Sequence, residues 1–128
     1  MAYILDTNVA IHLRDGDATT AARVAALADA VLISIFTRVE LDGGVYRDSA
    51  DAPTRRARLD VVLSAIPALA FDNVAANAYA KIVAQSGYSR RKLLDRMIAA
   101  QALVHRATLV TMNPNDFADI AGLRVEVW

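Results

Sequence analysis

The sequence predicts an α/β fold in three layers, with a central parallel sheet of four to five strands between two layers of helices. Short apolar runs rich in β-branched residues alternate along the 128-residue chain with longer segments of helical periodicity. The short runs are continuously apolar, which is typical of parallel strands covered on both faces. Because no linker, repeat or low-complexity tract interrupts this alternation, we expect one domain over residues 1–128.

The first quarter of the chain predicts two strands with helical segments between them. Residues 3–5 are an apolar run that ends at Asp6, which indicates a buried strand with polar groups at its carboxyl end. A short helical or turn segment follows and closes at residues 15–17. The apolar spacing and alanine content of residues 19–28 predict a helix. Residues 31–35 are β-branched and continuous, and they predict the second strand.

The middle of the chain predicts two helices and a third strand. Residues 37–47 have helical character, although two adjacent glycines weaken the second half of this helix. A loop containing a proline precedes a helix over residues 55–66. This helix stops before Pro67, because the residue before a proline disfavours the helical conformation. Residues 69–71 predict a third, short strand.

The last part of the chain predicts two more helices and two strands. Asp72 or Asn73 is a candidate N-cap for a helix over residues 74–85, and Gly87 is a natural C-cap for it. The next helix is longer and more apolar, and we expect it over residues 89–106. The remaining elements are a strand at 108–111, a turn leading into a short helix at 113–117, and a final strand at 123–128.

Composition excludes several kinds of protein. The chain has no cysteine, so it has no disulfide, cysteine nucleophile or thiolate zinc site. Lys plus Arg number 14 and Asp plus Glu number 14, which argues against nucleic-acid binding by bulk positive charge but allows a local basic patch. No uncharged apolar stretch reaches about 18 residues, so no transmembrane helix is expected. The N-terminus lacks the features of a signal peptide, and we expect a cytoplasmic protein.

Acidic side chains follow the expected strands at their carboxyl ends. Asp6 follows the first strand, and Asn113 and Asp116 follow the fourth. Glu40 lies early in the helix after the second strand, and Asp95 interrupts the apolar face of a later helix. Ligand sites of parallel sheets form at this edge, so we expect the acids to gather there. Their mutual repulsion favours a hard divalent cation with oxygen ligands, Mg²⁺ or Mn²⁺.

Each acid also has an explanation that involves no function. Asp6 and Asp116 are placed to cap a helix or a turn. Glu40 has the position of a surface helical charge. Asp95 has Arg91 one helical turn before it, which allows an ion pair between them.

Four segments of the chain, in order and at the right spacing, resemble the motifs of PIN-domain ribonucleases. They are Asp-Thr-Asn at 6–8, Thr-Arg-Val-Glu-Leu at 37–41, Asp-Arg-Met-Ile-Ala-Ala at 95–100, and Thr-Met-Asn-Pro-Asn-Asp-Phe at 111–117. The ending at 122–128 is similar to that of VapC-type toxins, the members of this family that belong to toxin–antitoxin pairs. The resemblance covers nearly the whole chain and implies a PIN-like fold.

The resemblance also implies an activity and its residues. It implies endonucleolytic cleavage of RNA that depends on Mg²⁺ or Mn²⁺ and leaves a 5′-phosphate and a 3′-hydroxyl. The catalytic and metal-binding acids correspond to Asp6, Glu40, Asp95 and Asp116. Asp95 or Asp116 is expected to orient or deprotonate the attacking water. The supporting polar groups correspond to Thr7, Asn8, Thr37 and Asn113.

Several partners are expected. RNA phosphates need cations near the acids, and the candidates for this role are Arg14, Arg90, Arg91 and Lys92. Arg55, Arg56 and Arg58 form a second basic cluster, for which a solvated helix face is the simpler interpretation. The resemblance suggests a homodimer. It also suggests a cognate antitoxin that lays an apolar segment into a groove formed by the helices between residues 19 and 66.

Other α/β proteins carry acids at their strand ends, and they remain alternatives. A haloacid-dehalogenase-type phosphatase needs a second aspartate two residues after the first, where this chain has Asn8. A receiver domain needs a phosphoacceptor after its third strand, where Asp72 lies, and a late lysine, but the last lysine here is Lys92. A non-catalytic binding module would tolerate the loss of any one acid.

Overall fold

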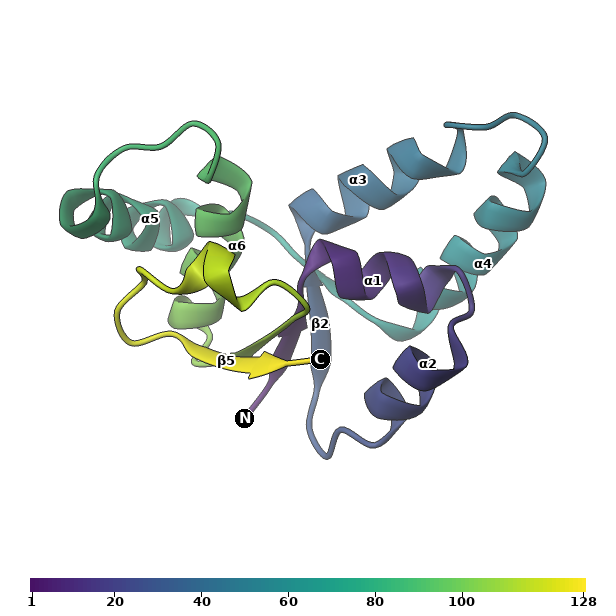
Figure 1. Ribbon diagram of the computed structural model, residues 1–128, viewed down its shortest axis with the longest axis horizontal. Coiled ribbons are helices and arrows are strands. Elements are labelled where there is room, and N and C mark those ends of the chain that lie inside the picture. Colours follow the sequence, from purple (N-terminus) through teal and green to yellow (C-terminus); the bar gives the residue numbers. More distant parts are fainter.

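The computed structural model describes residues 1–128 and has a five-stranded parallel sheet at its centre (Figure 1). The strands are β1 (Tyr3–Leu5), β2 (Val31–Ser34), β3 (Ala68–Leu69), β4 (Thr108–Thr111) and β5 (Arg124–Val127). The helices are α1 (Thr7–Arg14), α2 (Ala18–Ala25), α3 (Ile35–Val45), α4 (Ala52–Ala65), α5 (Asn73–Ser86), α6 (Leu93–Val104) and the short 3₁₀ helix η1 (Pro114–Phe117). None of these helices has the length and apolar character needed to span a bilayer.

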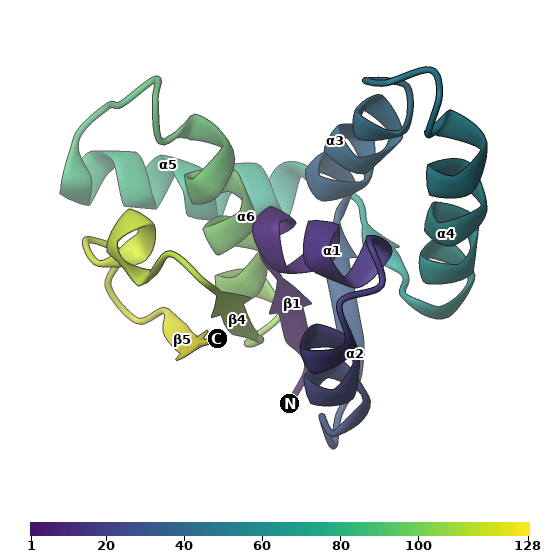
Figure 2. The ribbon, with the colours of Figure 1, turned by 45° about the vertical axis from the view of Figure 1, so that its right-hand side comes forward.

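The sheet separates two hydrophobic cores, because successive side chains of a strand point to opposite faces. Ile4 and Leu109 pack on the face that α5 and α6 cover. Leu5 and Val110, the next residues of the same strands, pack on the face that α1, α3 and α4 cover. Figures 1 and 2 show these two groups of helices on opposite sides of the strands. The predicted three-layer α/β architecture with a parallel sheet is therefore confirmed.

The strand order determines where a ligand can bind. The order is β3-β2-β1-β4-β5, so the chain moves from β1 to one side and then crosses to the other side at β4. Leu5 pairs with Ile33 of β2 and with Val110 of β4, which places the carboxyl ends of these strands level with one another. In open parallel sheets, ligands bind at the carboxyl ends where the strand order reverses. Asp6 is the first residue beyond β1 at this position.

Some predicted boundaries differ from those in the structure. Ile35 begins α3 and does not extend the strand, because the hydroxyl of Ser34 accepts a hydrogen bond from the Phe36 amide at 3.1 Å and caps the helix. The helix predicted from residue 89 begins only at Leu93. Gly87 is the C-cap of α5, as predicted, and its positive φ of 83° is a conformation that favours glycine.

The two-core arrangement predicts different costs for two valines of neighbouring strands. Val110→Ala is expected to lower the free energy of unfolding by about 2 kcal/mol, because it removes fully buried methyl groups and leaves a cavity. Val127→Ala is the matched control, because that side chain is 57 % exposed, and it is expected to have little effect. Urea unfolding of both variants measures the difference. Equal losses would contradict the assignment of the core.

Candidate active site

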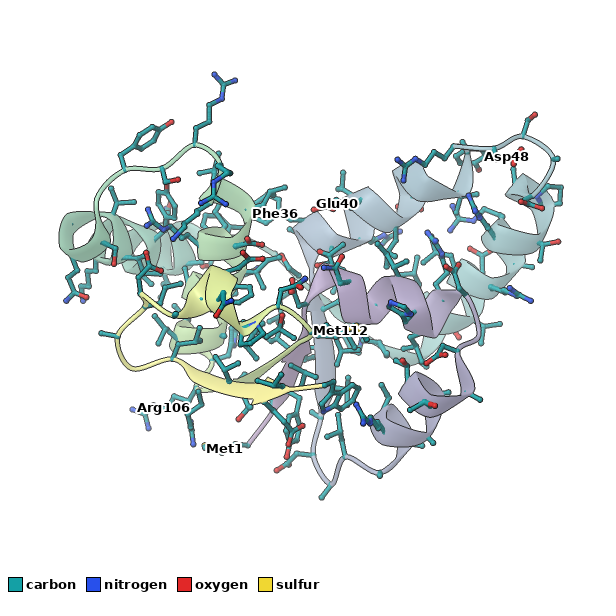
Figure 3. The ribbon with its side chains drawn as sticks, viewed as in Figure 1. Met1, Phe36, Glu40, Asp48, Arg106 and Met112 are labelled. Atoms are coloured by element: carbon teal, nitrogen blue, oxygen red, sulfur yellow. The ribbon has the colours of Figure 1, made fainter.

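The four acids singled out in the sequence line one cavity of about 230 Å³ at the carboxyl ends of β1 and β4. They come from four separate elements: the β1–α1 junction, α3, α6 and η1. Glu40 projects from α3, whose first turn lies beside the first turn of α1 (Figures 1 and 3). The full lining is Asp6, Thr7, Asn8, Glu40, Arg91, Leu94, Asp95, Ile98 and Asp116.

Asp6 is the most constrained of these acids. Its side chain is buried, with one carboxylate oxygen accepting from the Thr7 amide at 2.8 Å and the other accepting from the Thr111 hydroxyl at 2.8 Å. Its own amide donates to the carbonyl of Val110 at 2.9 Å. Burial raises the pKa of Asp6, while the hydrogen bonds from Thr111 and Thr7 act against that rise. Asp6 therefore caps α1, as its position suggested, and lines the cavity as well.

The supporting polar residues occupy different places. The hydroxyls of Thr7 and Thr37 lie 2.9 Å apart, so they join the first turn of α1 to the first turn of α3. Thr37 is fully buried and lies behind the cavity wall, whereas Thr7 and Asn8 line it. Asn113 is not part of the lining. Its backbone amide donates to the Thr111 hydroxyl at 3.0 Å.

Thr111 contacts the site although it was not among the predicted site residues. Its hydroxyl donates to Asp6 and accepts from the Asn113 amide, so it fixes the carboxylate at the end of the neighbouring strand. The signal in the sequence was its place as the last residue of the fourth strand and the first of the fourth motif. Leu94 and Ile98 were also not predicted, and they form the apolar part of the cavity wall.

Among the acids of the cavity, Asp95 has the largest shift in pKa. Burial, and then repulsion from Asp6, Asp116 and Glu40, raises its pKa from 3.8 to about 6. The charge of Arg91 opposes this rise, but Arg91 forms no ion pair with Asp95. The ion pair that the sequence allowed therefore does not account for the position of Asp95 in the helix. The pKa of Glu40 is raised in the same way, by burial and by the charge of Asp6.

The four cations predicted to bind RNA are spread around the site. Arg91 lines the acid cavity, and Arg90 is exposed on the turn before α6. Lys92 turns away, because its ammonium group forms an ion pair with Asp119 at 3.3 Å. Arg14 is buried and lies in a neighbouring cavity, where it pairs with Asp15. Of the four, only Arg91 therefore lines the acid cavity.

The donor set has the chemistry that a hard divalent cation requires. Carboxylate oxygens are the ligands that Mg²⁺ and Mn²⁺ prefer, and this cavity offers four of these groups. Burial and then mutual repulsion raise the pKa of Asp95 and Glu40, and a bound cation would relieve the repulsion. As the side chains lie, no three acids form a ready-made metal cluster, so a cation would have to draw the carboxylates closer together.

Known proteins are similar to this chain over most of its length. The model of the PIN domain family matches residues 3–123. This chain belongs to the PIN-domain family. Over its whole length this PIN-domain chain is 30% identical to the tRNA(fMet)-specific endonuclease VapC of Shigella flexneri, covering 98% of that protein. It is 28% identical to Ribonuclease VapC2 of Rickettsia felis, again covering 98%. The resemblance to VapC toxins noted in the sequence is therefore confirmed.

Several solved structures share the fold of this PIN-domain chain. The TM-score is 0.86 against VapBC2 from Rickettsia felis bound to a promoter DNA fragment, at 26% identity over 100% of this chain and 99% of that one. The TM-score against DNA-bound VapBC from Salmonella typhimurium is 0.85, at 26% identity over 100% of this chain and 98% of that one. The TM-score against FitAcB from Neisseria gonorrhoeae is 0.81, at 27% identity over 96% of this chain and 95% of that one. The predicted PIN-like fold is confirmed.

The acidity of Asp95 predicts how stability depends on pH. An acid whose pKa is about 6 in the folded chain and 3.8 when unfolded makes folding less favourable as the pH rises between those values. In metal-free protein at pH 7, Asp95→Asn is expected to raise the free energy of unfolding by about 1 kcal/mol, a value reduced for solvent screening of a half-exposed group. The gain should vanish below pH 4.

Urea unfolding in EDTA across this pH range measures the effect. Asp48→Asn is the control, because Asp48 is an exposed loop residue that caps only the Ala50 amide. A stabilising effect of Asp95→Asn that is the same at pH 4 and pH 7 would contradict the electrostatic explanation.

Proposed function

We propose that this protein is a metal-dependent endoribonuclease, the toxin of a toxin–antitoxin pair. The observation that supports it most directly is the convergence of four acids, from four elements, on one cavity at the switch point of the sheet. The names of its relatives, an endonuclease specific for a transfer RNA and a ribonuclease, support RNA as the substrate. Mg²⁺ or Mn²⁺ is the proposed cofactor, and the cytoplasm is the proposed location.

The side chains divide the work of phosphodiester hydrolysis. When bound, the divalent cation would supply Lewis acidity and neutralise charge that develops on the phosphate. Asp6, held by Thr111 and by the Thr7 amide, presents a carboxylate of fixed orientation to the cavity. Asp95 has a pKa near neutrality in the absence of metal, which suits a group that accepts a proton from the attacking water. Asp116 is the other candidate for this role, and Arg91 offsets part of the negative charge that meets the phosphate.

A second cavity supports an antitoxin partner. It has a volume of about 400 Å³, lies among α1, α2, β2 and α4, and is lined entirely by hydrophobic residues. Val61, one of these, is 68 % exposed. This is the region in which the sequence suggested a groove for an apolar segment. The toxin–antitoxin complexes among the structural relatives support the same partner. A homodimer stays a prediction.

The alternative functions fit the structure less well. A receiver domain would use Asp72 as its phosphoacceptor, but Asp72 caps α5 by accepting from the Ala75 amide at 2.9 Å and is not part of the acid cavity. A phosphatase of the haloacid-dehalogenase type would need a second acid where Asn8 lines the cavity. A non-catalytic module is distinguished from the proposed enzyme by an activity measurement.

Asp6→Asn tests the proposed enzyme. The variant keeps hydrogen-bond acceptance from Thr7 but loses the charge that a divalent cation would bind. Cleavage of a structured RNA with Mg²⁺ or Mn²⁺ is expected to fall on the order of a hundredfold or more. Asp48→Asn, outside the cavity, is expected to cleave like the wild type. Equal cleavage by Asp6→Asn and wild type would refute a nuclease centred on this cavity.

Thr111→Val tests whether orientation of Asp6 matters. The substitution keeps the shape and strand preference of the side chain but removes the hydroxyl that donates to Asp6. Activity at low Mg²⁺ is expected to fall roughly ten- to a hundredfold, with partial recovery at high Mg²⁺, because a group that orients a metal ligand is lost. Thr108→Val is the matched control at the opposite end of β4. A loss of activity that did not depend on Mg²⁺ would argue against this role.

A further inference from the structure

A basic cavity lies directly beside the acid cavity and shares Glu40 with it. It has a volume of about 540 Å³ and lies between the end of α1, the second half of α3 and the first turns of α4. Three arginines from these three regions line it: Arg14, Arg47 and Arg55. Because Glu40 lines both cavities, a linear polymer bound in one of them would extend into the other.

Two of the arginines are held in place by the protein. The side chain of Arg14 is only 6 % exposed, and its Nε and Nη2 both lie 3.1 Å from one oxygen of Asp15. Its Nη1 has no hydrogen-bond acceptor in the protein. Arg55 donates from Nη1 to the carbonyl of Gly44 at 3.2 Å. Arg47 is exposed on the bend that follows α3. The cavity thus holds two guanidinium groups in fixed positions and one that is free to move.

Gly44 explains how a buried arginine fits here. A Cβ atom built on Gly44 would lie 2.8 Å from Nη1 of Arg14, which is closer than real contacts allow. The absence of a side chain lets this guanidinium lie against α3, and the carbonyl of the same residue accepts from Arg55. The glycine that weakens α3 in the sequence therefore has a structural use, because it makes room for the guanidinium of Arg14.

We propose that this basic cavity binds a phosphate of the RNA backbone next to the phosphate that is cleaved. The proposal rests on the proposed function, because it takes RNA as the molecule in the acid cavity. Guanidinium groups bind phosphate through paired hydrogen bonds, and contacts of this kind position a nucleic acid without reading its sequence. The three positive charges face only Glu40 and Asp15, and Asp15 is already paired with Arg14. A bound phosphate would supply the acceptor that Nη1 of Arg14 lacks.

Binding of a fluorescein-labelled single-stranded RNA, followed by anisotropy, tests the proposal. It is measured in EDTA and with Ca²⁺, so that the result does not depend on cleavage. Arg47→Ala and Arg55→Ala are each expected to weaken binding about tenfold. The salt dependence of each should become shallower, by about 0.7 in the slope of log K against log salt. Arg23→Ala is the matched control. Arg23 belongs to α2 and lies over the ring of Trp128, so its loss should leave the RNA affinity unchanged.

The outcomes separate this proposal from the proposed nuclease. RNA affinity that is unchanged in both cavity variants, lowered equally by Arg23→Ala, or unmeasurable for the wild type at low salt would overturn the phosphate site. Binding of a polyglutamate peptide that requires Arg47 and Arg55, with RNA binding unaffected, would assign the cavity to an acidic protein segment and would also overturn it. Arginine-dependent RNA binding without any cleavage by the wild type would refute the nuclease alone.

Discussion

The buried carboxylate of Asp6 connects the parts of the molecule that form the acid cavity. Two bonds join Asp6 to the end of β4: its carboxylate accepts from the Thr111 hydroxyl, and its backbone amide donates to the carbonyl of Val110. Its carboxylate also accepts from the Thr7 amide and so caps α1 directly after β1. Thr7 continues the connection to Thr37 at the start of α3. This chain of hydrogen bonds fixes the relative positions of two strands and two helices at the point where the strand order reverses. Glu40, one turn further along α3, depends on that framework for its position relative to Asp6.

The acids at this edge of the sheet repel one another, and arginines nearby offset part of their negative charge. Burial, together with repulsion within the cavity, raises the pKa of Asp95 to about 6, so the acids there favour a bound metal cation or a proton. The arginines nearby are arranged around this charge, with Arg91 in the cavity and Arg47 and Arg55 in the one beside it. A net charge of zero is thus compatible with an RNA partner, because positive and negative groups are separated in space.

Much of the candidate site could be predicted because parallel strands place their ends together. Asp6 follows its predicted strand directly and Asp116 lies in the short turn after another, and the alternation of apolar runs and helices was sufficient to bring them to one edge. The bond between Thr111 and Asp6 could not be predicted, because it joins residues 105 positions apart and depends on which strand neighbours β1. The burial of Arg14 against Gly44 depends in the same way on how closely α1 packs on α3.

By itself the sequence determined the order of strands and helices, the faces they bury and the kinds of side chain at each strand end, because these follow from local periodicity and chain connectivity. Only the tertiary structure decided which side chains meet. Arg91 points to the acids, whereas its neighbour Lys92 pairs with Asp119 and Arg14 lies in another cavity. The direction of a side chain depends on what packs across from it. That partner comes from a distant part of the chain, and local sequence patterns carry no information about it.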